Sequence, residues 1–251
     1  MKLITSLYND DVKRAVELKD KKGRDKHKQF IAEGLRTIKT CLESPCECVQ
    51  LMVTQKAYEQ LPEEMIKNTP LTLVSFDIMK KISFSSMPSG FLGIFSMPKS
   101  RALAHLKPGI VLYNISDPGN MGTLIRTSVA LKACCVIIDG CDQLNPKVVQ
   151  ASAGLIAHAD CIETSWERLL LHKKDIPLCA LVVEGGEKPV AVNLAQSLLV
   201  VGSEAHGLPA EVIEQCDTRM TLPMEGPAES LNAAVAGSIA LYLQYQSRTT
   251  L

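Results

Sequence analysis

Three short stretches in the C-terminal half of the sequence place glycine, proline and small polar residues directly after apolar, strand-like runs. They are NISDPGNMGTLIRT (114–127), LVVGSEAHGLP (199–209) and LPMEGPAESLNAAVAG (222–237). Such residues are typical of the junction between a strand and a helix, where loop amides and helix N-termini converge on ligands in α/β proteins. The three stretches therefore predict a ligand site.

In the first stretch, Arg126 is the residue best suited to hold an anion. The segment from Asp117 to Asn120 is typical of a turn, and Arg126 follows on the next helix among apolar and small residues. A fixed guanidinium suits phosphate or carboxylate because its donors match the geometry of those groups. A surface or salt-bridged arginine is the alternative on this pattern alone.

The second stretch places Gly202 and Gly207 around a short polar turn after a fully apolar run. The spacing matches neither G-x-G-x-x-G nor the Walker pattern, which disfavours standard dinucleotide and triphosphate sites. Glu204 is a candidate either for a catalytic role or for capping the helix that follows Pro209. We expect His206 to face solvent.

The third stretch opens a helix rich in small residues. Ser230 is a natural N-cap, a role worth about 1 kcal/mol to a helix. Asn232, in the first turn of an apolar helix, has less structural reason to be there and is a candidate site residue. The alanines and Gly237 allow close backbone approach, either within the core or across a dimer seam.

No other catalytic or metal-binding pattern is present. The sequence lacks G-x-S-x-G and H-E-x-x-H, and its five histidines are not spaced as ligands. Nine cysteines, an odd number without a repeating frame, indicate reduced thiols in a cytoplasm. Cys41, Cys46 and Cys48 lack paired C-x-x-C spacing, so we expect no metal site.

The net charge of zero hides an asymmetry along the chain, because residues 1–100 are net basic and residues 101–251 net acidic. The run KDKKGRDKHK (19–28) is the densest basic segment. It indicates either a solvated helix face or a phosphate-contacting patch. No apolar run reaches the length of a membrane span, and the N-terminus turns acidic too early for a signal peptide.

The pattern of elements predicts two domains. Residues 1–96 form a small α/β unit, with helices expected over 8–22 and 30–42 and strands over 48–54, 71–76 and 90–97. Residues 97–108, with a proline near each end, are typical of a linker. In residues 109–251, strands alternate with helices, ending with a strand over 220–224 and a helix over 230–246. This alternation predicts a mostly parallel sheet covered on both faces.

Taken in order, the stretches resemble the motifs of the SpoU/TrmH-type RNA 2′-O-ribose methyltransferases of the SPOUT superfamily. The matching segments are DPGNMGTLIR (117–126), GSEAHG (202–207), LPM (222–224) and SLNAAVA (230–236). The resemblance covers residues 109–247. More weakly, residues 1–96 resemble the small ribosomal-protein-like RNA-binding domain that often precedes this fold, through a lysine-rich stretch and F-x-x-E-G at Phe30, Glu33 and Gly34.

The resemblance implies a fold, a cofactor and an assembly. The fold would be an α/β sheet whose C-terminal segment forms a deep trefoil knot, which periodicity cannot reveal. The knot would bind S-adenosyl-L-methionine, and the chain would form a homodimer. The implied cofactor-binding residues are Gly202, Leu222, Met224, Ser230 and Leu231.

The implied reaction is methylation of a ribose 2′-hydroxyl, which makes the substrate RNA rather than DNA. Arg126 would be the central catalytic residue, and Asn120, Glu204, Ser230 and Asn232 would orient it and the ribose. In this context the basic run becomes an RNA contact, through Lys19, Lys21, Lys22, Arg24, Lys26 and Lys28.

The RNA target and several alternatives stay open. Ribosomal RNA is favoured over transfer RNA because an RNA-binding domain precedes the expected methyltransferase domain. The alternatives are a tRNA 2′-O-methyltransferase, a non-catalytic RNA-binding member of the fold, a base methyltransferase of the same superfamily, and an unrelated small-molecule enzyme with a nucleotide pocket.

Overall fold

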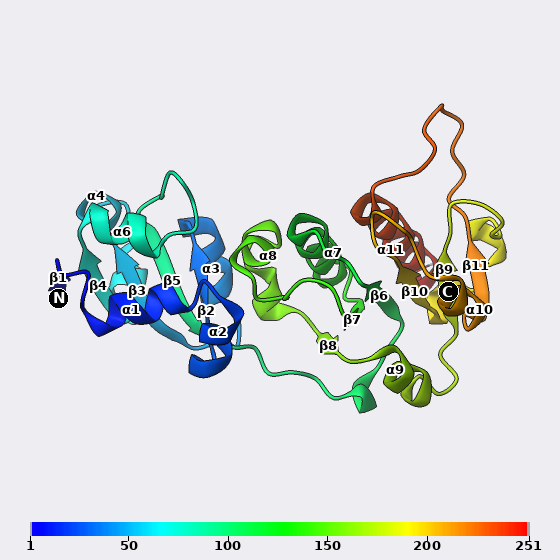
Figure 1. Ribbon diagram of the computed structural model, residues 1–251, viewed down its shortest axis with the longest axis horizontal. Coiled ribbons are helices and arrows are strands. Elements are labelled where there is room, and N and C mark those ends of the chain that lie inside the picture. The colour runs from blue at the N-terminus through cyan, green and yellow to red at the C-terminus, as the bar shows by residue number, and fades with distance from the viewer. Residues whose placement is uncertain (1, 250–251) are drawn as a thin grey trace. The chain divides into compact units, whose positions relative to one another are not determined.

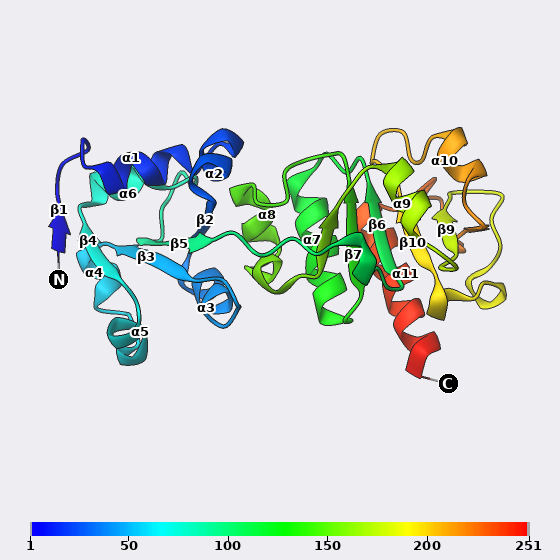
Figure 2. The ribbon, with the colours of Figure 1, turned by 90° about the horizontal axis from the view of Figure 1, so that it is seen from below.

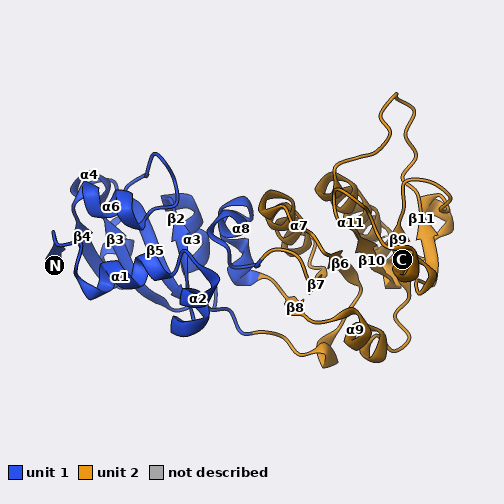
Figure 3. Cartoon of the chain, viewed as in Figure 1, with its two compact units in different colours: residues 1–99, 142–158 blue, residues 100–141, 159–251 orange. Residues whose placement is uncertain are grey.

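The computed structural model describes residues 2–249, which divide into two compact units (Figure 3). Of the described residues, the first contains residues 2–99 and 142–158, and the second contains residues 100–141 and 159–249. The sequence places residues 142–158 in the C-terminal domain, whereas they pack here with the first unit. Met1, Thr250 and Leu251, the outer ends of the expected domains, lie outside the described residues.

The first unit is a five-stranded sheet with helices on both faces. The strands are β1 (Lys2–Ile4), β2 (Gln29–Glu33), β3 (Cys48–Val53), β4 (Leu71–Val74) and β5 (Phe91–Ser96), in the order β1-β4-β3-β5-β2. The neighbours β1, β4 and β3 are parallel, and β5 runs antiparallel to both β3 and β2. The carboxyl ends of β1, β4 and β3 therefore meet at one edge of the sheet.

The helices of this unit divide between the two faces (Figure 2). They are α1 (Asp10–Glu17), α2 (Lys21–His27), α3 (Leu35–Leu42), α4 (Gln55–Tyr58), α5 (Glu63–Asn68), α6 (Phe76–Ile82) and α8 (Pro146–Ala151), the last followed by a 3₁₀ turn at Leu155–His158. In Figure 2, α1 and α6 lie above the sheet and α3, α4 and α5 below it. Val12 and Ile78 pack with Met52 and Ile94 of the sheet in one buried cluster.

Two sequence expectations for this unit were wrong. The helix expected over 8–22 is two helices, α1 and α2, because the chain turns after Leu18. The helix expected over 30–42 begins only at Leu35, since residues 29–33 form β2 and pair with β5. A short apolar run fits a buried strand and a helix equally well, so only pairing with β5 decides between them.

The second unit is a six-stranded sheet in which every strand pair is parallel, as the alternation of elements predicts. Its order is β11-β9-β10-β6-β7-β8 (Figure 1). The strands are β6 (Gly109–Tyr113), β7 (Cys134–Ile138), β8 (Cys161–Glu163), β9 (Leu178–Leu181), β10 (Leu198–Val201) and β11 (Thr218–Met220). The strand expected over 220–224 is therefore β11, and it ends at Met220. The sheet confirms the α/β class, while the knot stays a prediction.

Helices cover both faces of this sheet. They are α7 (Pro118–Ala130), α9 (Trp166–His172), α10 (Ala210–Glu214) and α11 (Ala233–Thr249), with 3₁₀ turns at Leu103–His105, Pro189–Ala191 and Leu194–Gln196. Trp166 of α9 and Val212 of α10 join the core on one face. On the other face α11 packs beside α7. There a Cβ on Gly237 would lie 2.6 Å from Leu124 Cδ2, so this small residue serves the core of its own chain.

The strand order places the first two sequence stretches side by side. From β6 the sheet grows through β7 and β8 in one direction and through β10 in the other, so the order reverses between β6 and β10. Ligands of open parallel sheets bind at such a reversal, beyond the carboxyl ends of the strands. The loop after β6 ends at Asp117, and Asn120 lies in the first turn of α7 that follows it; the loop after β10 carries Gly202 and Glu204. No helix in residues 2–249 combines the length and hydropathy needed to span a bilayer.

Candidate active site

A cavity of about 460 Å³ lies beyond the carboxyl ends of β9, β10 and β11, where α11 begins. Its lining includes residues from the second and third sequence stretches. All five residues expected to bind the cofactor are among them, and so are three of the expected catalytic residues, since Ser230 belongs to both sets: Gly202, Leu222, Met224, Ser230, Leu231, Glu204 and Asn232. Two chain segments that are separate in the sequence thus share one cavity.

The turn after β10 requires glycine at Gly202. A Cβ there would lie 2.2 Å from the carbonyl carbon of Gly207 and 2.5 Å from the amide nitrogen of Leu208. The turn is closed by a hydrogen bond of 2.9 Å from the Gly207 amide to the Ser203 carbonyl. Because Gly202 has no side chain, bare backbone forms this part of the cavity wall.

A chain of side-chain hydrogen bonds joins the three sequence stretches. Asn232 Nδ2 donates to Asn120 Oδ1 at 3.1 Å, and Asn120 Nδ2 donates to Glu204 Oε1 at 2.7 Å. Each amide uses its oxygen as acceptor and its nitrogen as donor, so the chain of bonds has one direction and ends on the carboxylate. Glu204 is therefore fixed in place as an acceptor.

Helix caps hold both asparagines where they can meet. Asp117 caps α7 by accepting the Asn120 amide at 2.8 Å, with Pro118 in the first turn. Asn232 Oδ1 accepts the amides of Ala234 and Val235 at 2.9 and 3.2 Å. Asn232 is thus the cap of α11, and the expectation that Ser230 caps this helix was wrong. The helix begins at Ala233, which leaves Ser230 exposed at the cavity.

Glu204 does not cap α10, so that alternative from the sequence was also wrong. Its carboxylate accepts from Asn120 and, at 3.5 Å, from the hydroxyl of Ser116. The sequence pattern did not single out Ser116, although it adjoins the Asp117 turn. His206 is exposed as expected, but it also lines the cavity.

Arg126 lies on the exposed face of α7 and is not among the residues that line the cavity of its own chain. Within residues 2–249 its side chain has no hydrogen-bond or ion-pair partner. Among the described residues Arg126 therefore forms no salt bridge, which was one of the alternatives from the sequence. The guanidinium is available to an external anion.

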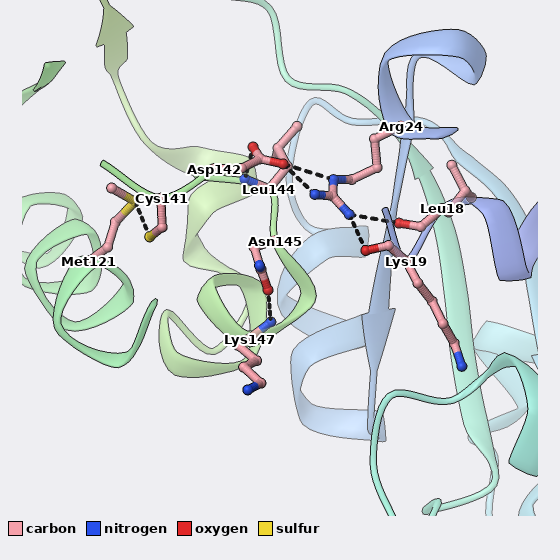
Figure 4. Close-up of polar contacts among 9 residues, drawn as sticks. All are labelled: Leu18, Lys19, Arg24, Met121, Cys141, Asp142, Leu144, Asn145 and Lys147. Atoms are coloured by element: carbon pink, nitrogen blue, oxygen red, sulfur yellow. Dashed lines mark hydrogen bonds and ion pairs between the residues drawn. The ribbon is translucent and has the colours of Figure 1, made fainter. Parts of the chain in front are cut away.

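The basic run of residues 19–28 is divided between the surface and the interior of the first unit. Arg24 is only 2% exposed. Figure 4 shows its guanidinium between Asp142 and the backbone of Leu18 and Lys19. Its guanidinium pairs with Asp142, with Nε 3.0 Å from Oδ2, and Nη1 donates to the carbonyls of Leu18 and Lys19 at 2.9 and 2.7 Å. Arg24 therefore secures the turn between α1 and α2 to the segment that precedes α8, and it is not available to RNA.

The lysines of the same run are arranged differently. Lys19 is half-buried and donates to the Lys81 carbonyl at 2.7 Å, and burial together with the nearby Lys81 ammonium lowers its pKa. Lys26 lies 2.8 Å from Glu17. The other members, Lys21, Lys22 and Lys28, are exposed.

Residues 142–158 are held to the first unit by further contacts. The His158 ring contacts the Thr40 carbonyl at 2.8 Å, and the thiol of Cys41 points to the Gly154 carbonyl at 3.7 Å. Burial raises the pKa of Cys41 to about 12, so this thiol stays protonated near neutral pH. These contacts join residues far apart in the sequence, and no local sequence signal could have indicated them.

Comparison with known families agrees with this geometry. The SpoU rRNA Methylase family matches residues 107–242, and the MRM3-like substrate binding domain matches residues 9–93. Since the first match covers more than half of the chain, the protein belongs to the SpoU rRNA methylase family.

Individual relatives match over nearly the whole chain. The 23S rRNA (guanosine(2553)-2′-O)-methyltransferase RlmP of Bacillus subtilis is 28% identical, over 96% of this chain and 98% of its own length. An AdoMet-bound rRNA methyltransferase from Sinorhizobium meliloti superposes with a TM-score of 0.84 at 26% identity, covering 100% of this chain and 98% of the other. An RNA 2′-O ribose methyltransferase structure gives 0.83 at 27% identity, covering 99% and 100%.

Proposed function

We propose that this chain transfers a methyl group from S-adenosylmethionine to a ribose 2′-hydroxyl of RNA, with ribosomal RNA as its substrate class. The observation that carries the proposal is that two of the sequence stretches line one cavity and are joined to the third by the hydrogen bonds of Asn232, Asn120 and Glu204. The rRNA methyltransferases among its relatives support the same substrate class.

The cavity suits S-adenosylmethionine in size and in lining. Its volume of about 460 Å³ lies in the range of small-ligand sites. Aliphatic Val201 and Leu222 form apolar walls, the Ser230 hydroxyl adds a hydrogen-bonding group, and the bare backbone at Gly202 admits a closely packed ligand. When bound there, the cofactor supplies an electrophilic methyl carbon.

The residues of the chain must then position the 2′-hydroxyl and help to remove its proton. A hydroxyl is a weak nucleophile until that proton is lost or shared. Arg126 cannot accept it, because a guanidinium stays charged in proteins. Arg126 instead holds the phosphate beside the reacting ribose, and that phosphate or a water molecule takes the proton. Asn120, Glu204, Ser230 and Asn232 orient the ribose and the arginine.

A homodimer completes the proposal. Four large apolar side chains follow one face of α11 at helical spacing and are 40–53% exposed: Val235, Ile239, Tyr242 and Tyr245. A second copy seated on this stripe would shield it from water. It would also approach the adjacent α7, and so bring Arg126 of one chain to the seam between the two copies.

The basic run contributes the substrate contact through its exposed lysines. Lys21, Lys22 and Lys28 are the strongest candidates, and Lys26 and Lys19 contribute less because they already have partners. Arg24 does not enter this contact. A deep trefoil knot within residues 109–251 and a cytoplasmic location, where all nine free thiols would stay reduced, also belong to the proposal.

The decisive test is methyl transfer by an Arg126→Ala variant. With tritiated cofactor and RNA from cells that lack this gene, turnover should fall at least ~100-fold, since the phosphate loses its anchor. Binding of S-adenosylmethionine, measured by calorimetry, should persist. Arg168→Ala removes an exposed arginine of α9 and is the matched control. Unchanged turnover in Arg126→Ala would refute this mechanism.

Two further measurements separate the alternatives. Nuclease digestion with mass spectrometry locates the methyl group, because a ribose methyl blocks cleavage at the adjacent 3′ phosphate whereas a base methyl does not. Fractionated ribosomal and transfer RNA identify the substrate class. A wild-type chain that binds RNA and cofactor but never turns over would be the non-catalytic member of the fold.

Mixed dimers test whether Arg126 acts across the seam. Combining Arg126→Ala chains with Gly202→Ala chains should restore activity if each arginine serves the cavity of its partner. Two inactive variants that stay inactive together would place the arginine and the cavity in one chain.

A further inference from the structure

A second cavity lies in the first unit. It has a volume of about 780 Å³ and opens at the edge where the carboxyl ends of β1, β4 and β3 meet. Thr5, Ser75 and Thr54 lie just beyond these ends. The proposed active site does not use this cavity.

An exposed aromatic ring lines this cavity. Phe76, at the first position of α6, is 52% exposed, although phenylalanine is mostly buried in folded proteins. The ammonium of Lys80, one helical turn further along, lies 4.8 Å from the ring centroid. This contact occupies a face of the ring and places a positive charge beside it.

The other lining groups are apolar or neutral, with one exception. Lys56 is the single charged residue among the described residues that line the cavity. The hydroxyls of Thr54 and Ser75 already accept backbone amides of α4 and α6. The side chains of Gln55 and Gln60, by contrast, have no hydrogen-bond partner in the part of the chain that the structure describes.

We propose that this cavity binds an unpaired nucleotide of the RNA substrate, with its base stacked on Phe76 and its phosphate held by Lys56 and Lys80. An aromatic ring with one lysine over its face, in a cavity lined also by a second lysine and two free side-chain amides, matches what single-stranded RNA presents: a flat base, a negative phosphate and hydrogen-bonding base edges. The charge favours RNA over an apolar protein segment, which would have no use for Lys56 and Lys80.

This inference rests on the proposed function, because it names a substrate contact of the same enzyme. The match of residues 9–93 to a substrate binding domain includes Phe76, Lys56 and Lys80. The cavity would act on substrate choice rather than on the chemical step, since it lies in the first unit and the residues proposed to act on the ribose lie in the second.

Phe76→Ala in the full-length chain tests the stacking. For RNA from cells that lack this gene, the KM of methyl transfer should rise about tenfold, as expected for the loss of one stacked base, while kcat stays unchanged. Phe76→Tyr, which keeps a ring, should behave as the wild type. Tyr8→Ala is the matched control, because Tyr8 is 85% exposed and does not line the cavity.

Photo-crosslinking gives a readout that is independent of turnover. An RNA oligonucleotide containing 5-iodouridine should crosslink to the peptide that contains Phe76, and Lys56→Ala should reduce the yield. If Phe76→Ala leaves the KM unchanged, or if the crosslinks map elsewhere, the nucleotide site is wrong. The nucleotide site would equally be wrong if Phe76 were needed for binding another protein and no RNA crosslinked to it. Failure of the proposed function itself would be seen instead as absence of methyl transfer by the wild-type chain.

Discussion

The three stretches of the second unit and the basic run of the first unit are the two strongest signals in the sequence. The three stretches come together in the structure, whereas the basic run does not act as one surface. The stretches meet as their residue types predict: Gly202, Glu204 and Asn232 line one cavity, and Asn120 is hydrogen-bonded to its rim. The basic run is divided, because Arg24 is buried while Lys21 and its neighbours are exposed.

The difference comes from what each residue type constrains. Glycine, proline and capping residues limit the backbone locally, so their order along the chain says where a strand ends and a helix begins. A basic side chain places almost no limit on the local backbone. Whether it is exposed depends on whether a carboxylate far away in the sequence, here Asp142, lies close to it in space and compensates for its burial.

Apart from the loss of Arg126, the largest effect should come from the backbone of the active site. Gly202→Ala forces the turn to shift, because the new Cβ would overlap Gly207. A displacement of this kind can lower turnover about 100-fold, and cofactor affinity should fall with it. Calorimetry and methyl-transfer assays measure both. Gly226→Ala, where a Cβ meets no atom within 4 Å, should leave both unchanged. Equal behaviour of the two variants would show that the turn does not shape the site.

The next largest effect is on the stability of the first unit, when Arg24 of the basic run is replaced. Arg24→Ala leaves Asp142 without its partner, and breaking a buried pair typically lowers the free energy of unfolding by about 3 kcal/mol or more. Lys21→Ala should change it by less than about 0.5 kcal/mol. Urea denaturation compares the two. In the double variant Arg24→Ala, Asp142→Ala, part of the stability should be recovered, and strict additivity would contradict a direct pair.

A smaller effect is expected on RNA affinity. Replacing Lys21, Lys22 and Lys28 together by alanine should weaken RNA binding at low salt while leaving the fold intact. The slope of log affinity against log salt should become shallower by about 0.7 for each phosphate that the variant no longer neutralises. Fluorescence anisotropy at several salt concentrations measures this slope. An unchanged slope would mean that the exposed lysines form only a solvated helix face.

The smallest effect is a change in titration. Hydrogen bonds from Lys26 and His27 hold the pKa of Glu17 below its ordinary value. The ionised Glu17 therefore stabilises the fold at neutral pH, and this stabilisation disappears as the pH falls through the lowered pKa. Lys26→Ala should raise the pKa of Glu17 toward that of a free glutamate, as followed by NMR titration. Lys21→Ala should not move it. If it does, the charge of the whole run, rather than the direct hydrogen bond, sets the pKa.

The fold was predictable where a pattern was long and local. Alternation of strands and helices after Gly109 predicts the parallel sheet. Residues 117–120, expected to form a turn before a helix, instead supply the cap and the first turn of α7. Short patterns failed, as in residues 30–33, which form a strand only because β5 pairs with them. The cap of α11 was assigned to Ser230, two residues early, because both serine and asparagine make good caps.

Many residues that line the cavity could be named from the sequence, but their contacts could not. The sequence alone determined where the chain turns and which small and polar residues stand at those turns, because these depend on neighbours along the backbone. Only the tertiary structure decided that Asn232 donates to Asn120, that Arg24 is buried against Asp142, and that residues 142–158 pack with the first unit. Such contacts join distant segments, and burial with its compensating partners arises only when those segments pack together.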